Sequence, residues 1–270
     1  MSGSPEFHEG LTSVKSERVR AIRRLTSASF REQVQRFLIE GPQAVREALM
    51  YRSAAIDEIF VLEAPEGPAA EVAEMARIAG MRVSVVPENV LLAMTETVHP
   101  QGIAAVSSFM DLPLKPVLGT GQLLVFLDQV RDPGNAGTIL RTADAAGADT
   151  VIFGNGCVDP YNGKLVRSTA GSLFHVPITR GADVVETIFT VRGHGFQVLA
   201  TSGSGDTQIP DIDLDRPTMW IFGNEAHGIS AEASEGANHR VSIPMYGPAE
   251  SLNLASAAAI CLYASAQAQH

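Results

Sequence analysis

The sequence predicts an α/β protein built from two domains, and three observations support this fold class. Strand-like apolar runs alternate with helical stretches along the chain, as in a sheet covered by helices. The runs after residue 121 are almost continuously apolar, which indicates a parallel sheet buried on both faces. Between the halves, Asp111–Pro116 carries two prolines and predicts an extended linker. We therefore expect a smaller N-terminal α/β domain over 8–112, a linker over 113–120 and a second domain over 121–270, with 1–7 (MSGSPEF) as a vector-derived tail.

The elements of the N-terminal domain follow from short local patterns. Apolar runs bounded by polar or turn residues predict strands. Gly41-Pro42 predicts the start of a helix, because proline fits the first helical turn. Gly80 predicts a helix end, where glycine adopts a left-handed conformation at little cost. The expected strands are 37–39, 56–62, 82–86 and 102–106, and the expected helices are 42–51, 69–79 and 90–96.

The second domain follows the same alternation with longer helices. Asn135 and Ser251 are good N-cap residues, because their side-chain oxygens can accept from free amides of the first turn. An alanine-rich run at the end of the chain predicts a closely packed final helix. The expected strands are 123–127, 150–153, 197–200, 219–222 and 240–243, and the expected helices are 137–146, 183–192 and 252–267.

The distribution of charge changes what the net charge alone suggests. A net charge of −10 argues against a nucleic-acid partner. Residues 1–52, however, hold nine bases against six acids, whereas the other 218 residues hold 11 bases against 24 acids. A local basic patch can bind phosphate on an acidic chain, because charges are screened over about 8–10 Å. The candidates for such contacts are Arg18, Arg20, Arg23 and Arg24; a solvated helix face is the alternative.

Several common classes of protein are excluded by missing patterns. The chain has no G-x-x-x-x-G-K-[ST] loop, no complete dinucleotide fingerprint, no H-E-x-x-H and no G-x-S-x-G. The only cysteines, Cys157 and Cys261, lie far apart and away from histidines at metal-ligand spacing. This cysteine usage argues against a disulfide scaffold or a zinc site and favours a reducing cytoplasm. No apolar run reaches the roughly 18 residues of a membrane span.

Three polar clusters follow strands of the predicted parallel sheet, at the edge where open α/β sheets bind ligands. They are 132–141 (DPGNAGTILR), 222–230 (FGNEAHGIS) and 243–254 (IPMYGPAESLNL). Each cluster also has a purely structural alternative. The first could be a capped helix that carries a surface arginine, and the second a glycine-rich turn. The third could be the N-cap of a helix whose small residues pack against a neighbouring backbone.

Taken together and in this order, the clusters resemble the motifs of the SpoU/TrmH family of RNA ribose 2′-O-methyltransferases, within the SPOUT class. The resemblance rests on DPGNAGTILRTADAAGAD, IFGNEAHGIS and VSIPMYGPAESLNLASAAAI, and covers 127–260. RFLIEGPQAVREAL and HPQGIAAV in the first domain resemble the family's substrate-binding domain, a ribosomal-protein-like RNA-binding fold.

The resemblance implies a deep C-terminal trefoil knot, a homodimer, S-adenosylmethionine as cofactor and no metal. It also implies the site residues. The catalytic set is Asn135, Arg141, Glu225, Ser251 and Asn253. The cofactor contacts are Gly223, Ile243 and Leu252, together with Thr201 and Gly203. An ordinary guanidinium is a poor base, so Arg141 is expected to hold the target phosphate and hydroxyl.

The expected substrate is 23S rRNA, because the separate N-terminal domain resembles that of rRNA-directed members. A tRNA ribose methyltransferase is the alternative within the same chemistry. A catalytically silent RNA-binding or assembly protein of the same fold is the alternative from another class. A nicotinamide-dependent enzyme is the weakest alternative, because the fingerprint is incomplete.

Overall fold

The computed structural model describes residues 11–115, 118 and 121–270. The expected tail, 1–7, and part of the expected linker therefore lie outside the described residues. The chain divides into two compact units. Unit 1 runs through Phe109 and includes Tyr161–Phe174, and unit 2 comprises Met110–Pro160 and His175–His270. The segment Tyr161–Phe174 was expected in the second domain, but in the structure it is part of unit 1.

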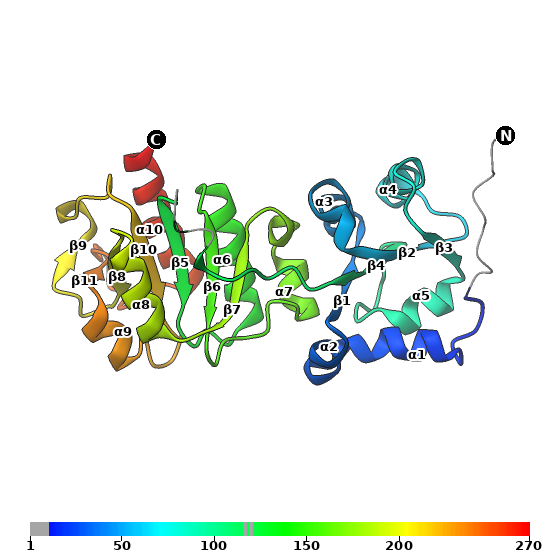
Figure 1. The fold of residues 1–270 in the computed structure, drawn as a ribbon, viewed down its shortest axis with the longest axis horizontal. Coiled ribbons are helices and arrows are strands. Elements are labelled where there is room, and N and C mark those ends of the chain that lie inside the picture. The colour runs from blue at the N-terminus through cyan, green and yellow to red at the C-terminus, as the bar shows by residue number, and fades with distance from the viewer. Residues whose placement is uncertain (1–10, 116–117, 119–120) are drawn as a thin grey trace. The chain divides into compact units, whose positions relative to one another are not determined.

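Unit 1 is a four-stranded sheet with helices on both faces (Figure 1). The strand order is β1 (Arg36–Glu40), β4 (Ile103–Ser108), β2 (Ile56–Leu62) and β3 (Val83–Val86). Strand β4 runs antiparallel to β1 and β2, and β3 runs parallel to β2. One face carries α3 (Pro42–Arg52) and α4 (Gly67–Ile78), and the other carries α1 (Glu17–Arg23) and α5 (Glu88–Met94). A short helix, α2 (Ala28–Val34), precedes β1.

The segment Tyr161–Phe174 belongs to unit 1 because its side chains pack there. The ring of Tyr161 is buried and stacks on Phe109, with 4.0 Å between ring centroids, and lies 4.6 Å from Phe37. Helix α7 (Gly163–Ser168) supplies Arg167, whose guanidinium lies 3.4 Å from Glu40. Such long-range packing leaves no local pattern in the sequence, so this segment could not be assigned to unit 1 from sequence.

Unit 2 is a seven-stranded parallel sheet in the order β7-β6-β5-β10-β8-β11-β9. The strands are β5 (Leu123–Leu127), β6 (Thr150–Gly154), β7 (Ile178–Ala182), β8 (Gln197–Thr201), β9 (Thr207–Gln208), β10 (Thr218–Phe222) and β11 (His239–Ser242). The predicted parallel α/β architecture is confirmed. Strand β7 (ITRGA) was not predicted, because only its first two residues are fully buried and the rest of its sequence is polar or small.

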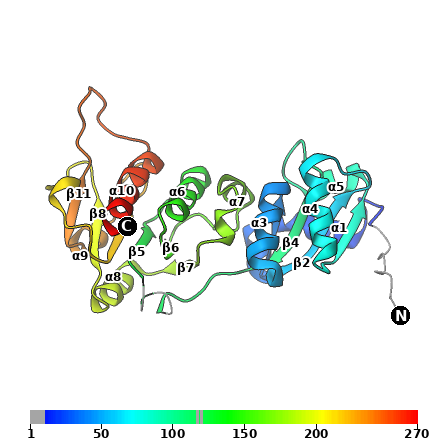
Figure 2. The ribbon, with the colours of Figure 1, turned by 90° about the horizontal axis from the view of Figure 1, so that it is seen from above.

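Helices cover both faces of this sheet, as Figure 2 shows. On one side lie α6 (Pro133–Ala145) and α10 (Leu254–Gln269), and on the other lie α8 (Val184–Gly193) and α9 (Ala231–Gly236). The buried indole of Trp220 on β10 donates to Ser265 Oγ on α10 at 2.8 Å. The final helix is therefore fixed to the centre of the sheet. The trefoil knot stays a prediction.

Two predicted helix caps are wrong by two or three residues. Helix α6 begins at Pro133, and its N-cap is Asp132, whose carboxylate accepts from the amide of Asn135 at 2.8 Å. Helix α10 begins at Leu254 and is capped by Asn253 rather than by Ser251. In both cases a second capping residue stands close by, and only the three-dimensional path of the chain selects between them. The side chain of Asn135 is thereby left free for other contacts.

Both cysteines are free thiols: Cys261 is buried, and Cys157 is partly buried and donates to the backbone oxygen of Leu127 at 3.0 Å. Burial raises the pKa of Cys157 to about 11 and that of Cys261, in α10, to about 12. Both thiols are therefore protonated at pH 8, where the reactive thiolate is scarce. We expect iodoacetamide to leave the native protein unmodified at pH 8 and to label both cysteines after unfolding in guanidinium. Rapid labelling of either thiol in the native state, followed by mass spectrometry, would contradict this placement.

No helix among the described residues is long and apolar enough to cross a membrane.

Candidate active site

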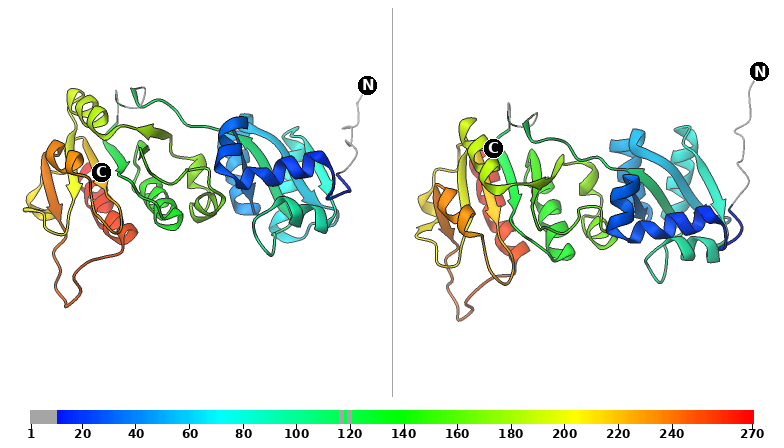
Figure 3. Two further views of the ribbon diagram at one scale, coloured as in Figure 1. Left: turned by 90° about the horizontal axis from the view of Figure 1, so that it is seen from below. Right: turned by 60° about the horizontal axis from the view of Figure 1, so that its bottom comes forward.

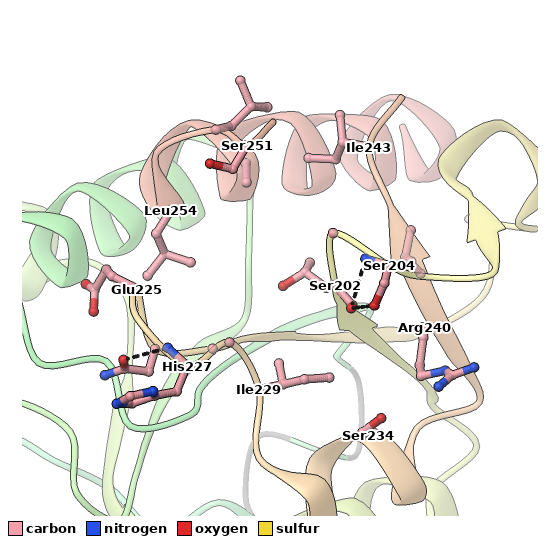
Figure 4. A pocket seen from close by; sticks show the side chains of 18 of the residues that line it. Ser202, Ser204, Glu225, His227, Ile229, Ser234, Arg240, Ile243, Ser251 and Leu254 are labelled. Atoms are coloured by element: carbon pink, nitrogen blue, oxygen red, sulfur yellow. Dashed lines mark hydrogen bonds between the residues drawn. The ribbon is translucent and has the colours of Figure 1, made fainter. Parts of the chain in front are cut away.

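A cavity of about 780 Å³ opens at the carboxyl ends of β8, β10 and β11 in unit 2 (Figure 4). This is the edge where parallel sheets bind ligands, and the volume is typical of small-molecule sites. The segments after these strands form its walls, with Ser202 and Ser204 following β8 and Glu225 following β10. All five expected cofactor contacts line it: Thr201, Gly203, Gly223, Ile243 and Leu252.

Gly223 allows the loop after β10 to fold back on itself. Asn224 and Gly228 exchange backbone hydrogen bonds of 2.8 Å, which closes the loop over Gly223. A Cβ atom at Gly223 would lie only 2.3 Å from the backbone of Gly228 and Ile229. The absence of a side chain is therefore a geometric requirement of this wall. The closed loop directs Glu225 to the rim of the cavity.

The third wall is the segment between β11 and α10. It projects from unit 2 as a long loop and returns into α10 (Figures 2 and 3). Ile243 at its start and Leu252 near its end line the cavity, and Tyr246 near its tip is 97% exposed. The backbone at both ends of this loop thus contributes to the cavity.

Three of the five expected catalytic residues form one hydrogen-bonded chain. The side-chain amide of Asn135 on α6 donates to Glu225 Oε1 at 3.0 Å. Its oxygen accepts from Asn253 Nδ2 at 3.1 Å. Asn253 Oδ1 in turn accepts from the amides of Ala255 and Ser256, which fixes its orientation as the cap of α10. Residues 90 and 118 positions away from Asn135 are thus brought together at one edge of the cavity.

The other two catalytic candidates are placed differently. Ser251 lines the cavity, next to Leu252. Arg141 is exposed on α6, six residues after Asn135, and does not line the cavity. Positions six apart on a helix are separated by about 9 Å along the axis and by about 120° around it. Within one chain, therefore, Arg141 and Asn135 do not share a face of α6.

The four basic candidates near the N-terminus differ in their contacts and exposure. Arg18 forms an ion pair with the buried carboxylate of Glu58, and burial is the main cause that lowers its pKa. The guanidinium of Arg24 lies 3.9 Å from the centre of the Phe30 ring. Arg24 is nevertheless exposed, as are Arg20 and Arg23 on α1. These three arginines are thus accessible for external contacts, whereas Arg18 holds α1 to the sheet of unit 1.

Two family models match this chain over most of its length. Residues 122–263 match the SpoU rRNA methylase family, and residues 38–110 match the RNA 2′-O ribose methyltransferase substrate-binding domain. The chain belongs to the SpoU rRNA methylase family. It is an RNA 2′-O-ribose methyltransferase by this membership, and its α/β sheet is the fold of SPOUT methyltransferases.

Relatives of this family resemble the chain over nearly its full length. The 23S rRNA (guanosine(2553)-2′-O)-methyltransferase RlmP of Bacillus subtilis is 35% identical over 253 residues, covering 94% of this chain and 97% of the relative. A crystal structure of an AdoMet-bound rRNA methyltransferase from Sinorhizobium meliloti is 34% identical with a TM-score of 0.85, covering 96% and 97%. The methyltransferase AviRb of Streptomyces viridochromogenes, solved with AdoMet, is 27% identical with a TM-score of 0.82, covering 93% and 98%.

Several residues that line the cavity of unit 2 were not candidates in the sequence analysis. They are Ser202, Ser204 and Arg240. The guanidinium of Arg240 donates to the carboxylate of Asp206 at 2.6 Å. In the segment after β8, Thr201 and Gly203 were named from sequence as cofactor contacts, but the serines beside them were not. The position of this segment after a parallel strand was the signal that could have added Ser202 and Ser204 to the candidate residues.

Proposed function

We propose that the protein transfers a methyl group from S-adenosylmethionine to a ribose 2′-hydroxyl of 23S rRNA in the cytoplasm. The observation that carries the proposal is the Asn135–Glu225–Asn253 chain at the rim of a ligand-sized cavity. Full-length similarity to the Bacillus subtilis enzyme supports 23S rRNA as the substrate. The presence of a substrate-binding domain in the same chain supports a structured RNA rather than a small acceptor.

The cavity suits S-adenosylmethionine in its size and in its lining. Apolar side chains such as Ile229 and Ile243 can cover an adenine ring, while serines and backbone groups can accept and donate hydrogen bonds. We assign Thr201, Gly203, Gly223, Ile243 and Leu252 to cofactor contacts. The cofactor supplies an electrophilic methyl group on a sulfonium, so the protein itself must orient the acceptor hydroxyl and manage one proton.

The acceptor side of the reaction falls to the catalytic set. We assign Arg141 to the target phosphate and hydroxyl, because a guanidinium binds phosphate in a bidentate geometry and does not act as a base. The phosphate that Arg141 holds helps to accept the proton that the 2′-hydroxyl loses. Asn135 fixes the carboxylate of Glu225, whose other oxygen stays available to a water or a guanidinium. Ser251 and Asn253 complete the rim with hydroxyl and amide groups. In this scheme Asn135 acts by positioning Glu225, so Asn135 itself does not have to bond to Arg141.

Parallel methylation assays test the choice of substrate. Unmodified 23S rRNA and bulk tRNA are incubated with the protein and S-adenosylmethionine labelled in the methyl group. Label in 23S rRNA is the expected result. Label in tRNA alone would instead support a tRNA methyltransferase. Cofactor binding without transfer to either RNA would point to an assembly intermediate as the substrate, and no cofactor binding would support a catalytically silent RNA-binding protein.

The exposed arginines of α1 give a separate prediction for RNA binding. Replacing both Arg20 and Arg23 by alanine removes two groups that can bind phosphate, so binding to 23S rRNA should weaken. The slope of log K against log salt should fall by about 0.7–0.9 for each phosphate that is no longer neutralised. Fluorescence anisotropy at several salt concentrations measures this slope. Arg77→Ala on α4 is the control. An unchanged slope in the double variant would show that α1 does not contact the RNA.

We also propose that the protein acts as a homodimer in which two chains complete each active site. Two observations support this proposal. The side chains of Ile260 and Tyr263 are exposed on α10 and offer an apolar surface to a second chain. Within one chain, Arg141 does not line the cavity whose rim carries Glu225. An Arg141→Ala chain mixed with a Glu225→Gln chain should then regain activity, because one of the two sites in the mixed dimer is intact. Sedimentation measures whether the dimer forms; mixtures as inactive as either variant would contradict a shared site.

A further inference from the structure

Unit 1 contains a second cavity, of about 320 Å³, whose lining residues lie outside the three motifs. It lies at the carboxyl end of β1 and the start of α3, and the segment Thr95–Gln101 and helix α7 close it. All of its lining residues belong to unit 1. Its volume is at the lower end of the range of about 300–1,000 Å³ for small-ligand sites. It is therefore suited to one small planar group rather than to an extended ligand.

Buried polar contacts hold the wall of this cavity in place. The carboxylate of Glu40, at the end of β1, is almost fully buried. It accepts from the amides of Glu96 and Thr97, at 2.7 and 3.2 Å, and from the Thr97 hydroxyl at 2.9 Å. Arg167 on α7 lies 3.4 Å from Glu40 and 3.3 Å from Glu96. The segment Thr95–Gln101 is thus tied to the sheet at several points, and its side chains are presented from a fixed backbone.

The glycine at position 41 leaves room beside it for the side-chain amide of Gln101. Its φ of +92° is a conformation that L side chains rarely adopt. A Cβ atom there would lie 2.8 Å from Gln101 Oε1, so the side-chain amide of Gln101 occupies the space that glycine leaves open. Gln43 lies two residues further on, in the first turn of α3, and its amide nitrogen donates to Glu47 at 2.9 Å. Both Gln43 and Gln101 line this cavity, and the bond to Glu47 leaves the side-chain oxygen of Gln43 as an acceptor.

The lining favours a neutral planar ligand over a phosphate. The guanidinium of Arg167 in the lining is already paired with the lining carboxylate of Glu40 and with Glu96 behind it, so the charged groups do not favour a further anion. Amide side chains pair with the edges of nucleobases through a donor and an acceptor side by side. An imidazole such as that of His99 and a guanidinium plane such as that of Arg167 are surfaces on which unpaired RNA bases stack. Ala44 and Ile103 add an apolar floor.

We propose that this cavity receives one unpaired base of the RNA substrate and reads its edge through Gln43 and Gln101. The inference rests on the proposed function, since it assigns a second recognition point to the same RNA. The base bound here is distinct from the nucleotide methylated at the cavity of unit 2. The site selects RNAs that expose an unstacked base, and this selection is independent of the chemistry of methyl transfer.

Steady-state methylation of a 23S rRNA transcript by the full chain tests the proposal. Gln101→Ala removes one partner of the base edge and touches no catalytic group. We expect the KM for the transcript to rise about 10-fold, as for the loss of a base-edge hydrogen-bond pair, with kcat and S-adenosylmethionine affinity unchanged. Gln33→Ala on α2, which does not line the cavity, is the matched control. A merely structural role would change thermal stability, which is measured in parallel.

Ultraviolet crosslinking of the same transcript to the wild-type protein gives a second readout. We expect a peptide containing His99–Gln101 to carry a crosslinked nucleotide. An unchanged KM in both Gln101→Ala and Gln43→Ala, with crosslinks only elsewhere and a wild-type enzyme that methylates the transcript, would overturn this inference and leave the proposed function intact. A wild-type protein that neither methylates nor binds the transcript would contradict the proposed function, and this inference with it.

Discussion

Arg141→Ala is expected to reduce the rate of methyl transfer to RNA by about 10³-fold while S-adenosylmethionine affinity stays within a few-fold. The guanidinium is assigned to the acceptor phosphate and hydroxyl, and loss of a positioned charged group in a transition state has effects of this size. The cofactor affinity should persist because Arg141 does not line the cavity of unit 2. Single-turnover transfer and equilibrium dialysis with labelled cofactor measure the two quantities.

The control for this variant is Arg192→Ala. Arg192 is near the end of α8, on the opposite face of the sheet from α6. Its guanidinium donates to the backbone oxygen of Gly236 at 3.2 Å, so its loss removes one positive charge without reaching the cavity. Arg192→Ala should therefore transfer methyl groups at the wild-type rate. Near-normal turnover in Arg141→Ala would show that the acceptor is held by other groups.

The second large effect is expected for Asn135→Ala, with a loss of about 10²-fold in transfer rate. The substitution removes both hydrogen bonds that join Glu225 to Asn253, and a displacement of about 1 Å in a catalytic group costs this much. Asn135→Asp should be equally impaired, because it keeps the shape but places a second carboxylate against Glu225. Thr142→Ala, on the same helix, removes only a local bond to Thr138 and serves as the control.

A double-mutant cycle decides whether Asn135 acts through Glu225. If it does, Glu225→Gln and Asn135→Ala combined should lose less than the product of the two single losses, because both changes remove the same oriented carboxylate. Strictly multiplicative losses would assign Asn135 a separate contact with the substrate.

Local patterns were sufficient for most of the fold. Strand β2 was predicted with its observed bounds, Ile56–Leu62, because it ends in the continuous apolar run 59–62, which Glu63 follows. The parallel sheet of unit 2 was predicted because its strands are buried on both faces and so are apolar at nearly every position. Strand β7 lacked this signal. The packing of Tyr161 with Phe109 in unit 1 could not be predicted, since no periodicity connects residues 52 positions apart.

The roles of the candidate site residues stay predictions, and their connections could not be predicted from sequence. The resemblance to the SpoU/TrmH family pointed to Asn135, Glu225 and Asn253, and the structure joins their side chains by hydrogen bonds. Which residue caps each helix depends on the exit direction of the preceding strand, so Asp132 and Asn253 were not selected as caps. Arg18 was assigned to RNA on its charge alone, whereas its partner Glu58 is 40 residues away and could not be paired with it from sequence.

The central claim is that the methyl group is placed on a ribose oxygen of 23S rRNA, and the chemical position of the transferred methyl tests it most directly. After reaction with labelled S-adenosylmethionine, the RNA is digested to nucleosides and the label is identified by mass spectrometry. We predict one 2′-O-methylnucleoside per 23S rRNA molecule, with an equal amount of S-adenosylhomocysteine released, and both products formed about 10³-fold more slowly by Arg141→Ala. A methyl group on a nucleobase, or equal yield from the Arg141→Ala variant, would contradict the account.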